Sequence, residues 1–201
     1  MVILILGISG CGKGTQAKLL AQKIGGVPVI SSGDAIRWAN KSNVARGREA
    51  VENYNNLGKL VPDEIVFGIL KAYMGNFDLS RGFIFDSFPR RLEQVPLLDQ
   101  ILSDTGETLS AVVHLETSPE LALERMRGRD NEDGTKGEAR GDANEQAIKE
   151  RFSFYQNQTT PVLEVYMKRG ILHNIDNSGT IGQVHEAVLK SLTGAGLCVD
   201  F

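Results

Sequence analysis

A short glycine-rich segment near the start of the chain, residues 7–16, has the composition of a phosphate-binding loop. It contains four glycines and one lysine, Lys13. Glycines let the backbone turn its N–H groups inward around a phosphate chain, and the N-terminus of a following helix adds partial positive charge. Lys13 is spaced to reach the outer phosphates. An ordinary strand-to-helix turn would not explain this lysine, so the segment predicts phosphate binding.

The residues on either side of this loop support the same interpretation. Residues 2–6 are an apolar run that predicts a buried parallel strand, and residues 17–23 have the pattern of an amphipathic helix. Strand, glycine-rich loop, lysine and helix together make a P-loop. The generic pattern G-x-x-x-x-G-K-[ST] has one departure, because Gly14 occupies the Ser/Thr position and the hydroxyl follows at Thr15.

Composition limits the class of protein. The 201 residues include 22 Lys+Arg and 25 Asp+Glu, a net charge of −3, so no basic excess points to nucleic acid. No apolar run approaches the roughly 18–20 residues that span a bilayer, and the first strand follows no charged leader. Cys11 and Cys198 are typical of free thiols in a reducing compartment. We therefore expect a cytoplasmic globular protein that binds neither nucleic acid nor membrane.

Strand-like and helical patterns alternate along the chain, with further strands expected at 27–31, 82–86, 111–115 and 170–175. This alternation predicts the α/β class: one three-layer α/β/α domain with a parallel five-stranded sheet. Ligands of such sheets bind at the carboxyl ends of the strands. The expected helices cover residues 34–41, 44–56, 63–75, 91–103, 119–127, 143–168 and 180–192.

Two segments interrupt the alternation. Residues 35–62 are helical without a strand and indicate a small insertion. Residues 129–141 are polar and glycine-rich, and arginines stand at both ends. A plain surface loop is the alternative for this second segment, but the arginines favour a mobile lid.

Asp86 ends one of the predicted strands, the position of an acid that orients magnesium in P-loop enzymes. Because Mg²⁺ keeps several of its waters, one carboxylate can act through water without direct coordination. A turn or N-cap aspartate is the alternative. The magnesium role is favoured because a phosphate-binding loop requires a nearby cation.

Arginines form a second candidate group. Phosphoryl transfer requires positive charge over the donor, the transferred group and the acceptor. Arginine meets this need because its planar guanidinium binds phosphate oxygens in pairs and stays charged. Arg125 and Arg129 are four residues apart, so one helix face would present both to a single site. The candidate arginines are Arg37, Arg90, Arg125, Arg129, Arg140 and Arg151.

The segment 31–34, Ser-Ser-Gly-Asp, follows one predicted strand and precedes a helix. It has the composition of a helix N-cap. It could equally place Ser32 against a second ligand, and the sequence leaves both interpretations open.

Six ordered motifs together make the chain similar to a known family, the adenylate kinases, which belong to the nucleoside monophosphate kinases. The likeness runs from residue 1 to about residue 192 and explains the Gly14-Thr15 departure. The motifs that carry it are residues 7–16 (G-x-P-G-x-G-K-G-T), 30–37 (I-S-T-G-D-x-x-R), 58–64 (G-x-L-V-P-D-E), 82–94 (G-F-x-x-D-G-F-P-R-x-x-x-Q), 125–129 (R-x-x-G-R) and 140–151 (R-x-D and a final R).

The resemblance implies a P-loop NTPase core (residues 1–31, 64–128 and 142–201), a monophosphate-binding helical insertion (32–63) and a short lid (129–141). It also implies hydrated magnesium near Thr15 and Asp86. ATP would be bound by Gly10, Cys11, Gly12, Lys13, Gly14, Thr15, Arg125, Arg129 and the backbone at Gly179. AMP would be bound by Ser32, Arg37, Lys59, Leu60, Val61, Ser87, Phe88, Pro89, Arg90, Gln94, Arg140 and Arg151. The catalytic group would be Lys13, Asp86, Arg90, Arg129, Arg140 and Arg151.

The chain departs from the family pattern in three places, at residue 87, at residue 143 and in the lid. Ser87 replaces the glycine of D-G-F-P-R, where its β-carbon could crowd the AMP phosphate or its hydroxyl could add a donor. Ala143 replaces a lid aspartate, and the lid lacks cysteines. Residues 193–201 extend past the motifs; we expect them to dock on the protein's own surface in a monomer, with a partner subunit as the alternative.

The resulting prediction is reversible, Mg-dependent phosphoryl transfer from ATP to AMP, which gives two ADP. A UMP/CMP kinase of the same fold is one alternative, but in those relatives the positions of Ser32 and Gln94 tend to be alanine and asparagine. A nucleotide-binding module without turnover is the other. The six arginines argue against it.

Metal analysis of the purified protein should find no stoichiometric zinc. A structural zinc site takes four nitrogen or sulfur ligands, sometimes with a carboxylate, and residues 129–141 contain neither cysteine nor histidine. One zinc per chain, removable only with loss of stability, would contradict this expectation.

Overall fold

The computed structural model describes residues 1–54, 59, 61–128 and 145–199. Its centre is one sheet of five parallel strands in the order β2-β3-β1-β4-β5, as the sequence predicted. The strands are β1 (Val2–Gly7), β2 (Val29–Ser31), β3 (Phe83–Asp86), β4 (Leu109–Glu116) and β5 (Leu172–Asp176).

The central strand β1 is buried on both faces, which explains its uninterrupted apolar sequence. Because side chains alternate along a strand, Val2, Leu4 and Leu6 enter one hydrophobic cluster, and Ile3 and Ile5 enter another on the opposite face. Both clusters hold the end of β1 in place, and the phosphate-binding loop begins there.

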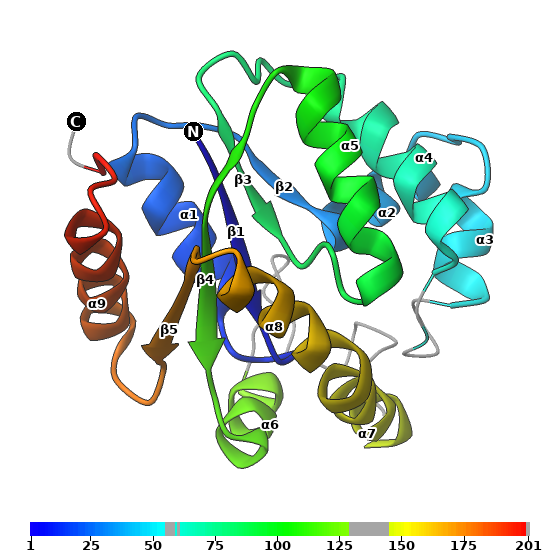
Figure 1. Ribbon diagram of the computed structural model, residues 1–201. Helices are drawn as coiled ribbons and strands as arrows, with labels where there is room; N and C mark the ends of the chain where they lie inside the picture. The colour runs from blue at the N-terminus through cyan, green and yellow to red at the C-terminus, as the bar shows by residue number, and fades with distance from the viewer. Residues whose placement is uncertain (55–58, 60, 129–144, 200–201) are drawn as a thin grey trace.

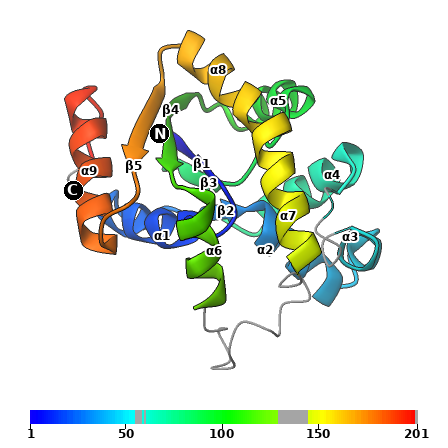
Figure 2. The ribbon, with the colours of Figure 1, turned by 90° about the horizontal axis from the view of Figure 1, so that it is seen from below.

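Helices cover both faces of the sheet (Figures 1 and 2). Helices α1 (Lys13–Lys23) and α9 (Ile181–Gly194) pack on the cluster that contains Ile3. Helices α5 (Val95–Thr105) and α8 (Thr160–Lys168) pack on the other. The predicted three-layer α/β/α arrangement is therefore confirmed.

The helical segment after β2 contains α2 (Ser32–Lys41), α3 (Gly47–Glu52) and α4 (Asp63–Met74). The three helices gather beyond the β2 edge of the sheet (Figure 1). The expected helix at 44–56 is wrong in its bounds. It starts only at Gly47 because Arg46, its N-cap, has left-handed backbone angles (φ 63°) that no helix continues.

The long helix expected at 143–168 has three described parts. Helix α7 (Glu145–Phe154) passes into a π-helical turn, η4 (Tyr155–Thr159), and then into α8. The helix expected at 91–103 likewise opens with a 3₁₀ turn, η2 (Leu92–Gln94), before α5. Single π turns are frequent at functional sites, and η4 lies beside the phosphate-binding loop.

The C-terminal segment packs on the rest of the chain. Val199 is buried, and Leu197 packs against the same cluster as α9. The expectation that this tail docks on the protein's own surface is confirmed up to Val199. Within the described ranges, no helix is both long and apolar enough to cross a membrane.

Candidate active site

The phosphate-binding loop joins the end of β1 to the start of α1. Two of its glycines are required by geometry. Gly10 has φ 88°, and a β-carbon there would lie 2.4 Å from the backbone oxygen of Ala122. Gly12 has φ 91° and forms the left-handed N-cap of α1. The glycines therefore allow the loop to pass close to α6 (Pro119–Arg127) and to turn into α1.

Lys13 is the first residue of α1, and its ammonium folds back over the loop. Its Nζ donates to the backbone oxygens of Gly7 (2.8 Å) and Ile8 (2.9 Å), and lies 3.6 Å from the Cys11 sulfur. These acceptors are neutral, so the lysine charge is not cancelled by a carboxylate in these contacts.

Arg125 ties the loop to the segment after β5. Its Nη1 donates to the backbone oxygen of Cys11 (3.2 Å), and its Nη2 donates to those of Asn177 (2.9 Å) and Gly179 (3.4 Å). The expectation that Arg125 and Arg129 share one helix is wrong, because α6 ends at Arg127 with Gly128 as its C-cap. Arg129 itself lies outside the described residues.

The end of β3 brings Asp86, Ser87 and Arg90 together. The Ser87 hydroxyl donates to Asp86 Oδ1 (2.7 Å), and Arg90 Nε donates to the backbone oxygen of Ser87 (2.9 Å). Ser32 Oγ donates to that same oxygen (3.1 Å) and accepts from Arg90 Nη2 (3.3 Å). Within residues 31–34, Ser31 is the N-cap of α2 and accepts from the Asp34 N–H, while Ser32 is bonded to Ser87 and Arg90.

Arg90 is held through its backbone as well. Its N–H donates to Gln94 Oε1 (2.7 Å), and its carbonyl accepts from the Thr159 hydroxyl (2.8 Å). Burial lowers the pKa of the Arg90 guanidinium; Asp86 opposes this shift and the nearby Arg151 adds to it. A guanidinium held at so many points is pre-organised for an anion.

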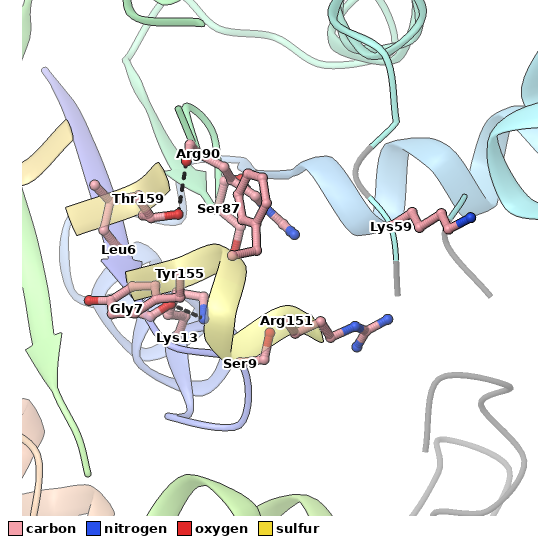
Figure 3. Close-up of a pocket in the computed structure, with 11 residues that line it drawn as sticks. Leu6, Gly7, Ser9, Lys13, Lys59, Ser87, Arg90, Arg151, Tyr155 and Thr159 are labelled. Atoms are coloured by element: carbon pink, nitrogen blue, oxygen red, sulfur yellow. Dashed lines mark hydrogen bonds between the residues drawn. The ribbon is translucent and has the colours of Figure 1, made fainter. Parts of the chain in front are cut away.

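Four cationic side chains line one pocket above the loop: Lys13, Lys59, Arg90 and Arg151. They come from four separate places in the chain, with Arg90 from the segment after β3 and Arg151 from α7 (Figure 3). Tyr155 and Thr159 of η4 complete this wall. Such a pocket suits a ligand with several negative charges.

A second pocket adjoins the first. It is lined by seven residues that the sequence predicted for one ligand: Ser32, Lys59, Val61, Ser87, Phe88, Arg90 and Gln94. Lys59, Ser87 and Arg90 line both pockets. Arg37, also predicted for this ligand, lies on α2 and pairs with Asp34. Pro89 follows Phe88 through a cis peptide bond. Leu60 and Arg140 lie outside the described residues, as does the expected lid.

Gln94 is fixed by residues to which the sequence assigned no role. Its Nε2 donates to Asp63 Oδ1 (2.6 Å), and Arg91 holds the same carboxylate through Nε (3.1 Å) and Nη2 (2.6 Å). The only signal in the sequence was that Asp63 stands at the start of α4, inside the motif at 58–64. A primary amide has two N–H donors and two acceptor lone pairs, so Gln94 keeps one of each for a ligand.

His114 and Tyr155 form a further pair that the sequence did not indicate. His114 Nε2 lies 2.6 Å from the Tyr155 hydroxyl, and Nδ1 lies 2.9 Å from Asn174 Oδ1. Burial lowers the pKa of His114, the Asn174 bond and Glu116 oppose the shift, and Lys13 adds to it. A neutral ring that donates to Asn174 and accepts from Tyr155 satisfies both contacts. The pair therefore links β4 to the wall of the first pocket.

Among the described residues, no cluster of three or more His, Cys, Asp or Glu could hold a metal ion. Asp86 is buried and faces the loop, since a β-carbon on Gly14 would lie 3.7 Å from Asp86 Oδ2. This single carboxylate near Gly14 suits a hydrated ion that keeps most of its own waters.

A phosphate-binding loop that opens into a second cation-lined pocket is the arrangement of a P-loop kinase, which moves a phosphoryl group between two bound molecules. The sequence model of the family described as adenylate kinase matches residues 5–171. The chain belongs to the adenylate kinase family. This result confirms the predicted family and the predicted enzyme class, a nucleoside monophosphate kinase.

Known adenylate kinases are similar to this chain over nearly its whole length. The adenylate kinase of Leptospira biflexa is 37% identical over 190 residues, which cover 94% of this chain and 98% of that protein. The adenylate kinase of Bifidobacterium longum is 38% identical, with 96% of this chain and 100% of that protein covered. The adenylate kinase of Stenotrophomonas maltophilia is 34% identical, with 96% of this chain and 100% of that protein covered.

Two replacements of Ser87 should separate the strain of its left-handed backbone conformation from the stabilisation that its hydroxyl gives. Ser87 has φ 68°, a left-handed conformation that costs a residue with a β-carbon about 1–2 kcal/mol. Ser87→Ala loses the bond to Asp86 and keeps this strain, whereas Ser87→Gly loses both. We expect the free energy of unfolding of the glycine variant to exceed that of the alanine variant by about 1 kcal/mol. Equal or reversed stabilities in urea would contradict the strain.

Proposed function

We propose that the protein catalyses the reversible transfer of the γ-phosphoryl group of ATP to AMP, which gives two ADP. The observation that carries the proposal is that the two pockets share Lys59, Ser87 and Arg90. A phosphate chain in the loop and a monophosphate in the second pocket would therefore meet beside Arg90. In-line transfer between two bound nucleotides requires this contiguity.

The proposed mechanism is positioning and charge neutralisation, without a covalent intermediate. ATP phosphates bind the loop N–H groups, and the Lys13 ammonium exchanges the Gly7 and Ile8 oxygens for oxygens of the moving phosphoryl group. Arg90 and Arg151 bind the acceptor phosphate and the group in transit. Ser32, Val61, Phe88 and Gln94 surround AMP. Arg37 is assigned to AMP by the sequence resemblance.

Mg²⁺ would accompany ATP, as it does in adenylate kinases generally. Its waters would be oriented by Asp86 and the Thr15 hydroxyl. When bound, the ion neutralises phosphate charge. The same resemblance supports the roles of Arg129, Arg140, Leu60, Gly179 and Arg125, and the division into core, monophosphate-binding insertion (32–63) and lid (129–141).

The test is ADP formation from ATP and each of AMP, UMP, CMP and GMP, and AMP should be the preferred acceptor.

Lys13→Ala should lower kcat at least about a hundredfold, the scale of removing one pre-organised transition-state donor. Its thermal stability should stay near that of the wild type. Lys18→Ala is the matched control, because Lys18 is exposed on the same helix, outside both pockets. A Lys13→Ala variant that keeps more than about a tenth of the activity would contradict the mechanism.

Gln94→Ala should lower the ratio of kcat/KM for AMP to that for UMP. Loss of a base-reading amide costs about 1–3 kcal/mol of discrimination. Stability should fall as well, because the amide also binds Arg90 and Asp63. Glu93→Ala is the control, since this neighbouring side chain is exposed and lines neither pocket. An unchanged ratio in the folded Gln94→Ala variant would exclude Gln94 as the specificity residue and favour a UMP/CMP kinase.

A further inference from the structure

We propose that Asn177 is the positioning residue of the phosphate-binding loop, and this inference rests on the proposed use of that loop for ATP. Asn177 follows β5 and is only 3% exposed. Its Nδ2 donates to the backbone oxygen of Cys11 (2.6 Å) and to Thr117 Oγ1 (2.7 Å). Neither the motifs nor the likeness to adenylate kinases assigned a role to this side chain.

The peptide bond between Cys11 and Gly12 explains why that contact matters. A trans peptide is planar, and its C=O and N–H point in opposite directions. Asn177 and Arg125 both bind the Cys11 oxygen, so the Gly12 N–H must point away from them. The Gly12 N–H makes no hydrogen bond to another described residue. The contact therefore holds one loop donor ready for an anion.

The Cys11–Gly12 peptide needs a stabilising contact from outside the loop because of the glycines next to Cys11. Gly10 has φ 88° and Gly12 has φ 91°, so the residues on both sides of Cys11 adopt conformations in which glycine is permissive. Without a fixed carbonyl, the Cys11–Gly12 peptide could rotate and turn an oxygen toward the phosphate. A buried amide donor prevents that rotation at a site where an oxygen would repel the ligand.

Asn177 is better suited to this task than Arg125, the other donor to Cys11. Arg125 binds the Cys11 oxygen at 3.2 Å, and in the proposed function it also binds ATP. Asn177 has no such second duty. Its own backbone N–H donates to the Glu116 oxygen (3.0 Å), and its carbonyl accepts from Arg125 (2.9 Å). The backbone of Asn177 is thus anchored both to the end of β4 and to Arg125.

The decisive experiment compares Asn177→Ala with Thr117→Val. Asn177→Ala removes both contacts of the Asn177 amide, whereas Thr117→Val removes only the contact with Thr117 and leaves the one with Cys11. The probe is inorganic tripolyphosphate, which has no base, so its affinity by calorimetry reports the phosphate-binding part of the site without any contact to a base. We expect Asn177→Ala to weaken that affinity about ten- to a hundredfold, the range for groups that orient a binding group. The KM for ATP should rise in parallel, and the KM for AMP should not change.

Thr117→Val should leave tripolyphosphate affinity unchanged. Equal losses in both variants would overturn the proposal, because the Cys11 contact would then not be the cause. A folded Asn177→Ala variant with wild-type affinity would also overturn it, even if its thermal stability were lower, since the residue would then be merely structural.

A measurement on the unmodified protein covers the case in which Asn177→Ala does not fold. The Nδ2 protons of Asn177 should resist exchange with solvent, by NMR, both in the free protein and with tripolyphosphate bound. Loss of that protection on binding would overturn the proposal. A protein whose tripolyphosphate affinity depends on Asn177 but which forms no ADP from ATP and AMP would contradict the proposed function and leave this inference standing.

Discussion

Cations gathered in one pocket repel one another, and the rest of this site depends on how the chain offsets that repulsion. Lys13 and Arg90 donate to backbone oxygens of the loop and of Ser87. Carbonyl dipoles carry no net charge, so a phosphate can replace them without competing against a carboxylate. Asp86, the one buried acid among the residues whose burial the structure describes, is bound by the Ser87 hydroxyl. Positive charge therefore stays available for a ligand.

The sheet sets the spacing between the two charged groups. Strands β1 and β3 are parallel neighbours, and their register pairs Ile5 with Asp86. The Ser87 N–H continues this ladder to the Ile5 oxygen (3.3 Å). Because the phosphate-binding loop leaves β1 just beyond Ile5, the loop and the Asp86–Arg90 segment must start side by side. Burial of both strands on both faces gives the site a rigid base.

Sequence reasoning succeeded where a function is carried by contiguous residues. The loop at 7–16 and the segment at 82–94 could be recognised because glycine, lysine, aspartate and arginine stand at characteristic spacings. It failed where distant segments meet: nothing local in Asn177 indicates that its amide reaches Cys11, 166 residues away. The helix bounds at 44–56 failed for another reason, since propensity does not reveal that Arg46 adopts a left-handed conformation.

The π turn η4 shows how such long-range contacts accumulate. Its first residue, Tyr155, bonds to His114 on β4, and its last, Thr159, bonds to the Arg90 carbonyl (2.8 Å). Helix α7 before it carries Arg151 to the pocket, and α8 after it buries Val162 and Tyr166 in the core. A change in helical pitch thus joins a charged helix to an apolar one. Because the turn is bonded to β4 at one end and to Arg90 at the other, the packing of α8 also supports the position of Arg90.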